Sequence, residues 1–379
     1  MRADSVVIVI HNLLGGPISR DYTGVKTLPM FLYTAGVIGM SVAFFTLCLC
    51  DLHHMLYSRD LVLSVIDLLM LLGIATTVFT IQSSSLIKHL YKSGASLFQC
   101  LADIDGHLYA LNMRRDPAHS FSSNCLIGFA CASSISLAYL LANVLRIKRT
   151  VGMIFAFKTY GLFVVFLMHG LFLVFSYQIW QRIRYMVKHL EKMIATINRQ
   201  NDQSIVAAAG NVGLRFFRDL KMLAIVHSHC FRAVTRLNEE CGLANVSIFG
   251  MFFYVLTAKS FQLFYICSIE FKRHGFTFTH VLEPTVLIIA VFSYFFATTY
   301  LGEMVLRETQ LVINNLHKLE SLHKTDQSEL VEQLGNQIMH QTICFNVINF
   351  FQIDLKFFHQ VMASVATYLI ILLQFDFQN

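Results

Sequence analysis

The sequence has very little charge for its length. Only 14% of its 379 residues are Asp, Glu, Lys or Arg, whereas soluble domains carry about 25%. Proline and tryptophan are also scarce, at four residues and one residue, while phenylalanine occurs 34 times. With 55% hydrophobic residues and a mean hydropathy of +0.58, a soluble chain could not cover its surface with polar groups. These shortages exclude an ordinary soluble protein and indicate helices that lie in a bilayer.

The sequence also lacks the motifs of the common enzyme classes and metal sites. It contains no P-loop, no G-x-S-x-G, no H-E-x-x-H and no C-x-x-C pair. His227, His229 and Cys230 lie close together, but a helical surface cluster explains them better than a metal site. We therefore expect no enzyme activity, no metal and no cofactor. The net charge of +6 arises largely between the apolar stretches, so it reflects topology and anionic lipid rather than nucleic acid.

Apolar stretches long enough to cross a bilayer recur along the chain, each with the roughly 20 residues that a spanning helix requires. The predicted fold class is therefore an all-α polytopic membrane protein. Pro284 suits the first turn of the sixth span, which is short. The seven predicted spans are Leu28–Leu49, Leu61–Leu86, Ser122–Leu145, Met153–Trp180, Leu243–Ile269, Thr285–Tyr300 and Leu355–Phe375.

The segments between several spans are also helix-like. Residues 181–200 continue the fourth span without a helix breaker, and residues 216–240 form a charged amphipathic segment that leads into the fifth span. Leucines within residues 301–339 follow a roughly helical period. We expect this last segment to be a packed cytoplasmic helix that meets other subunits, with a solvated connector as the alternative.

The distribution of Lys and Arg predicts the topology. With the N-terminus inside, the inner segments hold many more Lys and Arg residues than the outer loops, although the cluster Arg146–Arg149 opposes the trend. Seven spans then place the C-terminus outside, which is the reverse of a G-protein-coupled receptor. The helical extensions on the inner side are expected to form an anchor.

The last span carries a stripe of polar side chains. Such a stripe must face protein or water, because lipid cannot satisfy its hydrogen bonds. A polar seam between helices is one interpretation and the wall of a pore is another. Spacings of four, three, four and three residues place one set of side chains on the same helical face: Gln360, Ser364, Thr367, Ile371 and Gln374.

The end of the chain carries the most specific motif. Thr367 and Tyr368 are followed by five aliphatic residues and then by Gln374 and Phe375. Upstream, residues 349–354 contain an aromatic–aromatic–x–Ile–Asp stretch. Both patterns resemble signatures of the insect gustatory receptor family, and the predicted layout and the length agree with it.

The resemblance implies a ligand-gated, non-selective cation channel in the plasma membrane of a sensory dendrite. It implies a homo- or heterotetramer with other gustatory receptor subunits, in which the last helix lines the pore and a small-molecule tastant is the ligand. Gln374 and Phe375 occupy the positions that narrow the pore near its outer end, while Tyr368 is structural. Sugar receptors of the family usually carry an acidic residue where this chain has Leu369, so a bitter or other aversive compound is favoured.

Other classes remain as alternatives: a related odorant receptor, a G-protein-coupled receptor or a secondary transporter. On the channel interpretation, the chain has four regions. These are a cytoplasmic segment at 1–27, a six-helix ligand-binding region with cytoplasmic extensions at 28–300, an anchor helix and re-entry at 301–354, and a pore-lining helix with the outer C-terminus at 355–379.

Ionisable residues inside membrane spans are costly, so each is a candidate for function. Three of them fall in the outer halves of the second, fourth and fifth spans, where the resemblance implies an outward-facing ligand pocket. A structural ion pair or a snorkelling lysine is the alternative for each. His169 is expected to be a satisfied core histidine. The predicted pocket residues are Asp67, Lys158, Tyr160, Lys259, Gln262 and Tyr265.

Overall fold

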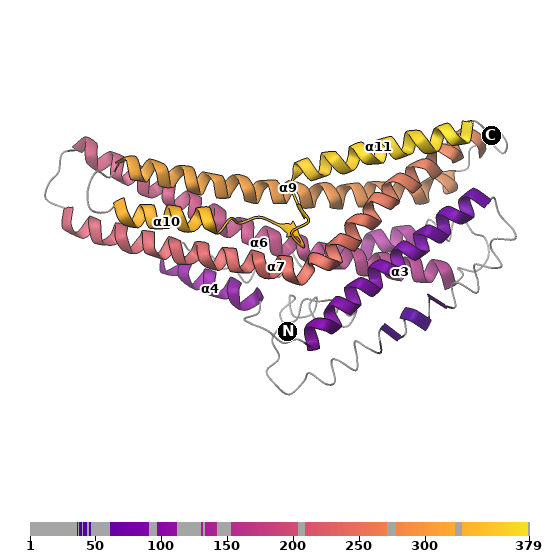
Figure 1. Ribbon diagram of the computed structural model, residues 1–379, viewed down its shortest axis with the longest axis horizontal. Coiled ribbons are helices and arrows are strands. Elements are labelled where there is room, and N and C mark those ends of the chain that lie inside the picture. Colours follow the sequence, from indigo (N-terminus) through magenta and orange to yellow (C-terminus); the bar gives the residue numbers. More distant parts are fainter. Residues whose placement is uncertain are drawn as a thin grey trace.

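The protein is an elongated bundle of long helices in the computed structural model (Figure 1). The structure describes residues 36, 38–39, 41–43, 45–46, 61–90, 97–111, 130–131, 133–141, 153–203, 209–270, 278–322 and 328–377.

Three helices run side by side along the length of the bundle (Figure 1). They are α6 (Met153–Gln203), α7 (Ala209–Tyr265) and α9 (Phe278–Leu322). The shortest of them has 45 residues, which corresponds to about 68 Å, whereas the hydrocarbon core of a bilayer is about 30 Å thick. Each helix must therefore cross the membrane and continue well beyond it, as the absence of breakers after the fourth span predicts.

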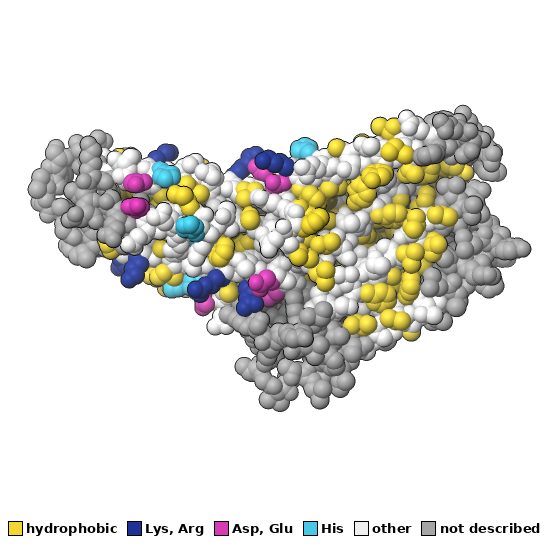
Figure 2. All heavy atoms as spheres, in the orientation of Figure 1, with side chains coloured by type: hydrophobic (Ala, Val, Ile, Leu, Met, Phe, Trp, Pro, Cys, Tyr) yellow, Lys and Arg dark blue, Asp and Glu magenta, His cyan; other side chains and the backbone are white. Residues whose placement is uncertain are grey.

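Charge divides the bundle into two halves. Figure 2 shows Lys, Arg, Asp, Glu and His side chains over the left and middle of the molecule, and hydrophobic side chains over the right. Within the described residues, four helices are long and apolar enough to span a membrane: α6, α7, α9 and α11 (Leu355–Phe377). A shorter apolar stretch, Leu68–Ser84, lies in α3 (Leu61–Leu90). The right half is therefore the membrane part and the left half is the extension outside it.

The remaining elements lie around these helices. Helix α4 (Leu97–Ala110) packs on α7, and α10 (Ser328–His340) packs on α9 and α7. Strands β1 (Asn346–Val347) and β2 (Phe351–Gln352) form a small antiparallel hairpin that leads into α11. A π-helical turn, η2 (Ile266–Glu270), ends α7. The helical fold class is confirmed.

Contacts between helices fix their directions. The Tyr254 hydroxyl of α7 donates to the Ile66 carbonyl of α3 over 2.8 Å, and the Ser247 hydroxyl donates to Thr80 over 3.2 Å. Residues with higher numbers on α7 thus contact residues with lower numbers on α3, so the two helices are antiparallel. The end of α11 lies at the apolar end of the bundle, opposite the charged half (Figure 1).

Several predictions about the spans change or remain open. The first and third predicted spans lie mostly outside the described residues, so the count of seven and the side of the N-terminus stay predictions. The expectation that Pro284 begins the sixth helix is wrong, because α9 starts at Phe278. A proline this near a helix end removes one donor and disturbs only the first turns, so the helix tolerates it.

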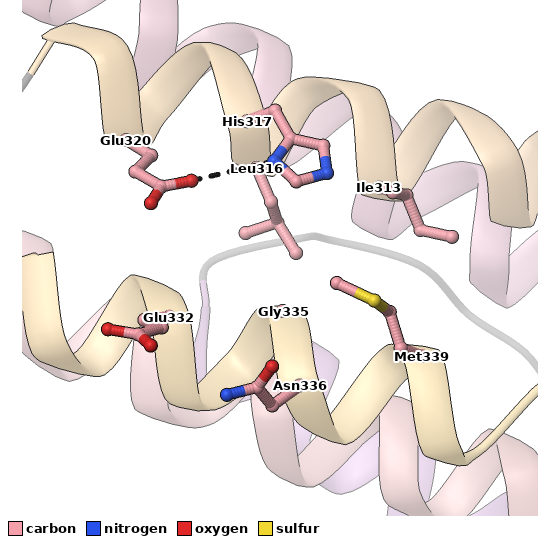
Figure 3. A pocket seen from close by; sticks show the side chains of 8 residues that line it. All are labelled: Ile313, Leu316, His317, Glu320, Glu332, Gly335, Asn336 and Met339. Carbon is pink, nitrogen blue, oxygen red and sulfur yellow. Dashed lines mark hydrogen bonds and ion pairs between the residues drawn. The ribbon is translucent and has the colours of Figure 1, made fainter.

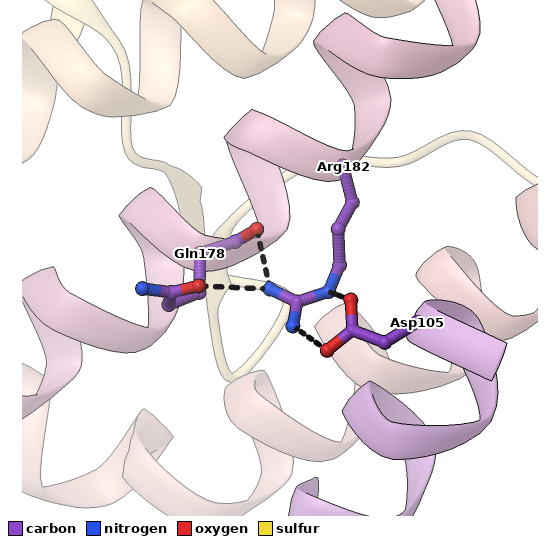
Figure 4. Close-up of polar contacts among 3 residues, drawn as sticks. All are labelled: Asp105, Gln178 and Arg182. Atoms are coloured by element: carbon purple, nitrogen blue, oxygen red, sulfur yellow. Dashed lines mark hydrogen bonds and ion pairs between the residues drawn. The ribbon is translucent and has the colours of Figure 1, made fainter. Parts of the chain in front are cut away.

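A buried arginine joins α4 to α6 (Figure 4). Arg182 Nε and Nη2 donate to the two carboxylate oxygens of Asp105, over 2.9 and 2.5 Å. Its Nη1 donates to the carbonyl and side-chain oxygens of Gln178, over 2.8 and 3.0 Å. A guanidinium that donates to both oxygens of a carboxylate and to two further oxygens has its hydrogen-bonding groups satisfied despite its burial. The network therefore fixes α4 against the long helices.

His227 on α7 lies in the core of the charged half, and Cys230 is buried too, so the expectation of a surface cluster is wrong for both residues. His227 is 1% exposed, neither ring nitrogen has a hydrogen-bond partner among the described residues, and burial lowers its pKa to about 4. The unfolded chain, with a histidine pKa of about 6.5, binds more protons between these values. We expect the free energy of unfolding to fall as pH drops from about 6.5 towards 4, by up to roughly 3 kcal/mol for this residue.

The measurement is the thermal unfolding midpoint in detergent at pH 7 and pH 5. The variant His227→Gln, which cannot titrate, should show a smaller drop than the wild type. His340→Gln, at an exposed position on α10, is the control and should leave the drop unchanged. Equal drops for His227→Gln and the wild type would contradict the assignment.

Candidate functional site

The hairpin and a carboxylate define where α11 begins. Ile348 and Asn349 have positive φ angles of 50° and 54°, which turn the chain back on itself after β1. The Asp354 Oδ1 atom accepts a hydrogen bond of 2.8 Å from the Phe357 backbone N–H, and therefore caps the first turn of the helix. The Ile–Asp end of the motif thus has a structural role that the sequence pattern did not specify.

One face of α11 packs against the bundle. Phe358 and Val365 are buried at 7% and 6% exposure, and Val361 and Met362 are half-buried between them. The helix contacts α7 and α9 along this face. Because successive residues turn by about 100°, the predicted polar stripe lies on the opposite side of the helix. All five of its residues are exposed on the single chain: Gln360, Ser364, Thr367, Ile371 and Gln374.

The stripe contains two kinds of polar group. The Ser364 and Thr367 hydroxyls donate to the Gln360 and Ala363 carbonyls of their own helix, over 2.9 and 3.0 Å. Such groups are satisfied locally and tolerate an apolar surrounding. A glutamine amide has two donors and an acceptor, and the exposed side chains of Gln360 and Gln374 require partners outside the helix. Hydrocarbon cannot supply them, so this face must meet water or another protein surface.

The motif residues beside the stripe lie as follows. Tyr368 is 54% exposed, and its ring packs edge-on against Phe253 of α7 with centroids 5.7 Å apart. This contact agrees with the prediction that it faces a neighbouring helix. Phe375 belongs to α11, but its side chain lies outside the described part of the chain. Its role at the constriction stays a prediction.

A buried ion pair joins α7 and α9 in the apolar half of the bundle. Lys259 Nζ lies 2.8 Å from Glu283 Oε1 and 2.8 Å from Gln262 Oε1, and the two charged side chains are 1% and 2% exposed. Opposite charges in contact offset much of the cost of taking each out of water. The structure therefore brings two predicted pocket residues together with a carboxylate that sequence reasoning had left out.

The other predicted pocket residues lie on α3, α6 and the end of α7. The Gln82 side chain of α3 donates to the Tyr160 hydroxyl over 3.4 Å. Lys158 is buried at 1% exposure two residues earlier on α6, and Tyr265 is half-buried as the last residue of α7. Asp67 lies on α3, with its side chain outside the described part. The candidates thus lie on three helices in the apolar half of the bundle, and their outward orientation stays a prediction.

Sequence reasoning missed three polar residues in this region. Glu283 directly precedes Pro284 and lies two residues before the predicted start of the sixth span. An acid at the edge of a span is a candidate partner for an intramembrane lysine such as Lys259. Gln82 and Thr298 are buried at 0% and 2% exposure. Thr298 lies 2.6 Å from His169 Nε2, a contact that partly fits the expected satisfied core histidine. A single uncharged polar residue changes the mean hydropathy of a long span little, so only the fold reveals the contacts of these two.

A separate hollow lies in the charged half, between α9 and α10 (Figure 3). Its volume is about 130 Å³, with Ile313, Leu316 and Met339 among the lining residues and Glu320 and Glu332 on opposite sides. It contains none of the predicted pocket residues. This hollow is therefore not the outward-facing pocket that the sequence predicts.

Comparisons with known proteins agree on one family. The family described as "7tm Chemosensory receptor" matches residues 11–379. The structure of the insect olfactory receptor OR5 from Machilis hrabei matches with a TM-score of 0.63 and 12% identity, over 98% of this chain and 97% of that one. The same receptor in complex with eugenol matches with a TM-score of 0.55 and 14% identity, over the same shares of 98% and 97%.

Because the sequence identity of the two structural matches is low, they establish the fold alone. A comparison with curated proteins gave no match. The family match covers nearly the whole chain and includes all the described helices. The chain therefore belongs to the seven-transmembrane chemosensory receptor family.

Proposed function

We propose that this protein is a gustatory receptor that acts as a ligand-gated, non-selective cation channel in the plasma membrane of a sensory dendrite. The observation that carries the proposal is the exposed polar face of α11. An amide-bearing stripe on the outside of a single chain at membrane depth needs water or another protein surface beside it, and a water-filled pore supplies such a surrounding. Four copies arranged around an axis, as homo- or heterotetramer, would enclose such a pore between their α11 helices.

The proposed gate lies near the outer end of α11. Four Phe375 side chains would close the pore by excluding water, and four Gln374 amides would coordinate a partly dehydrated cation. Lys356 is exposed near the inner end of the helix, where its flexible stem allows the charge to lie away from the axis. Tastant bound among the outer ends of the other helices would bias opening only through a higher affinity for the open state.

The division of the chain follows from this proposal. The charged half would be the cytoplasmic anchor that holds the subunits together, and α11 would form the pore. The apolar half of the other helices would hold the ligand. The described extensions of α6, α7 and α9 support an anchor, because they continue beyond the membrane as ordered helices.

Two observations favour different receptor types, one gustatory and one odorant. The run from Thr367 to Phe375 resembles the gustatory signature, and Leu369 in place of an acid favours bitter or other aversive ligands over sugars. The likeness to OR5, one of whose structures is a complex with eugenol, favours an odorant type. We retain the gustatory proposal because the motif lies in the proposed pore, and the odorant type is the second candidate.

Expression in oocytes with a panel of bitter compounds, sugars and volatile odorants tests the proposal. A cation current evoked by bitter compounds supports it, and a response restricted to volatile compounds supports the odorant type. Co-expression with another family subunit covers the case of a heteromer. Ligand-evoked signals without any ionic current in surface-expressed protein would refute the channel.

Lys158 is expected to contribute to the proposed pocket. Replacing it with glutamine removes a buried charge near the outer end of α6 and should shift the half-maximal ligand concentration by about tenfold, the effect of about 1.4 kcal/mol. The reversal potential should stay unchanged, since the pore is elsewhere. Lys188→Gln, exposed on the same helix in the charged half, is the matched control. A dose–response curve for Lys158→Gln that coincides with wild type would remove this residue from the pocket.

A further inference from the structure

The inner end of α11 is fixed to the bundle by an unusually close backbone approach. At Gly302 on α9, an added methyl group would overlap the carbonyl oxygen of Ile353 and lie 3.0 Å from its carbonyl carbon. Both neighbours are backbone atoms, so no side chain can move aside to make room. Only glycine therefore allows α9 to approach the segment that begins the last helix.

Polar contacts from α7 hold the same segment. The Asn238 side-chain amide donates to the Cys344 carbonyl over 3.0 Å and accepts from the Asn346 N–H over 3.3 Å. The Ile353 N–H donates to the Phe345 carbonyl over 2.9 Å, which closes the hairpin. Residues 344–353 are thus fastened to α7 at one end and pressed against α9 at the other.

An aromatic cluster completes the contact. The Phe249 ring of α7 lies 5.5 Å from Phe357 of α11, 6.0 Å from Phe351 of β2 and 5.6 Å from Phe295 of α9, measured between centroids. It also lies 5.6 Å from the His169 ring of α6. These separations are those of favourable ring packing. One side chain therefore joins the three long helices to the start of α11.

The outer half of α11 is held much less. Among the described residues, Tyr368 with Phe253 gives the ring contact there, and residues 366–368 and 370–372 are exposed. A helix held firmly at one end follows the movement of that end. Displacements of α7 and α9 relative to each other must therefore reach α11 mainly through its inner end.

We propose that Gly302 and Phe249 form a seat that sets the position of the pore helix, and that both are positioning residues for gating. This inference rests on the proposed channel function. A constriction that closes by excluding water requires the four helices to be in register. A change that shifts or loosens the seat displaces the far end of each helix and should leave gaps at the constriction.

The test measures resting current in oocytes, without any ligand, divided by the number of channels at the surface. Gly302→Ala, which pushes the Ile353 carbonyl away, should raise this current at least roughly threefold, as should Phe249→Leu, which removes the ring contacts. Reversal potentials in sodium and potassium solutions should stay at wild-type values, because the pore lining is unchanged. Gly250→Ala, where nothing lies within 4 Å of the added methyl, is the matched control and should behave as wild type.

Phe375→Ala serves as the reference for an opened constriction. If Phe375→Ala conducts at rest but Gly302→Ala and Phe249→Leu do not, the seat is refuted and the channel proposal stands. If Gly302→Ala fails to reach the surface, Phe249→Leu decides alone, and a resting current equal to wild type refutes the inference. If Phe375→Ala has no resting current and no ligand evokes a current in the wild type, the channel proposal fails, and the seat fails with it.

Discussion

Phe375→Ala is expected to raise the ligand-independent current of the surface-expressed protein by about tenfold, the effect of lowering a barrier by about 1.4 kcal/mol. Removing four large rings would widen the proposed constriction and allow water to fill it. A hydrated passage lowers the barrier for a cation in the resting state. Holding current in oocytes measures the effect, normalised to surface protein by biotinylation.

Gln374→Ala should act differently at the adjacent position. Alanine offers no amide oxygen to a passing cation, so conductance or cation preference should change while the resting current stays low. Reversal potentials in sodium, potassium and calcium solutions separate the two effects. Low resting current in Phe375→Ala, together with unchanged permeability in Gln374→Ala, would place the gate elsewhere on α11.

Breaking the pair between Lys259 and Glu283 is expected to be the most destabilising single change in the membrane half. The two side chains are 1% and 2% exposed, so Glu283→Ala leaves a lysine charge buried without this partner. Removing one member of a buried ion pair costs about 3–5 kcal/mol. We expect a lower thermal unfolding midpoint in detergent and less protein at the cell surface for Glu283→Ala and for Lys259→Ala.

The double variant Lys259→Met with Glu283→Gln distinguishes a pair from two independent residues. It removes both charges and should recover more than half of the lost stability, because the penalty belongs to the unpaired charge. Arg307→Ala is the control, since its partner Glu303 lies 3.1 Å away in an exposed pair worth at most about 1 kcal/mol. Additive losses in the double variant would contradict the assignment. If the double variant recovers stability, Lys259 affects ligand sensitivity through the position of α7 and α9.

The sequence allows the long helices and the polar stripe to be predicted because both depend on local periodicity. Residues 181–200 lack a breaker and continue α6, and the spacing from Gln360 to Gln374 places the stripe on the face that the structure leaves exposed. These features require only the helical period and the hydropathy of the segment. The resemblance at residues 367–375 agrees with the chemosensory receptor family that matches nearly the full length, and its gustatory type stays a proposal.

Features that depend on two distant segments could not be predicted in this way. The partner of Lys259 is Glu283, on another helix and at the edge of a span, and hydropathy does not connect them. The ion-pair partner of Arg182 is Asp105, which lies 77 residues earlier in the chain on α4. The glycine at 302 has no special φ angle and no turn around it, so only the approach of Ile353 explains it. Long-range packing supplies each of these answers.

The most direct test of the account is thiol modification of single cysteines on α11 while current flows. A charged, membrane-impermeant thiol reagent should reach Ser364→Cys and Thr367→Cys, which lie on the exposed stripe. The current should fall while the reagent is applied. Val365→Cys, on the opposite, buried face at 6% exposure, should be unaffected, as should the parent protein with its own cysteines. Block at the stripe alone is the predicted result. Equal block at Val365→Cys, or no block at the stripe, would contradict a pore lined by this helix.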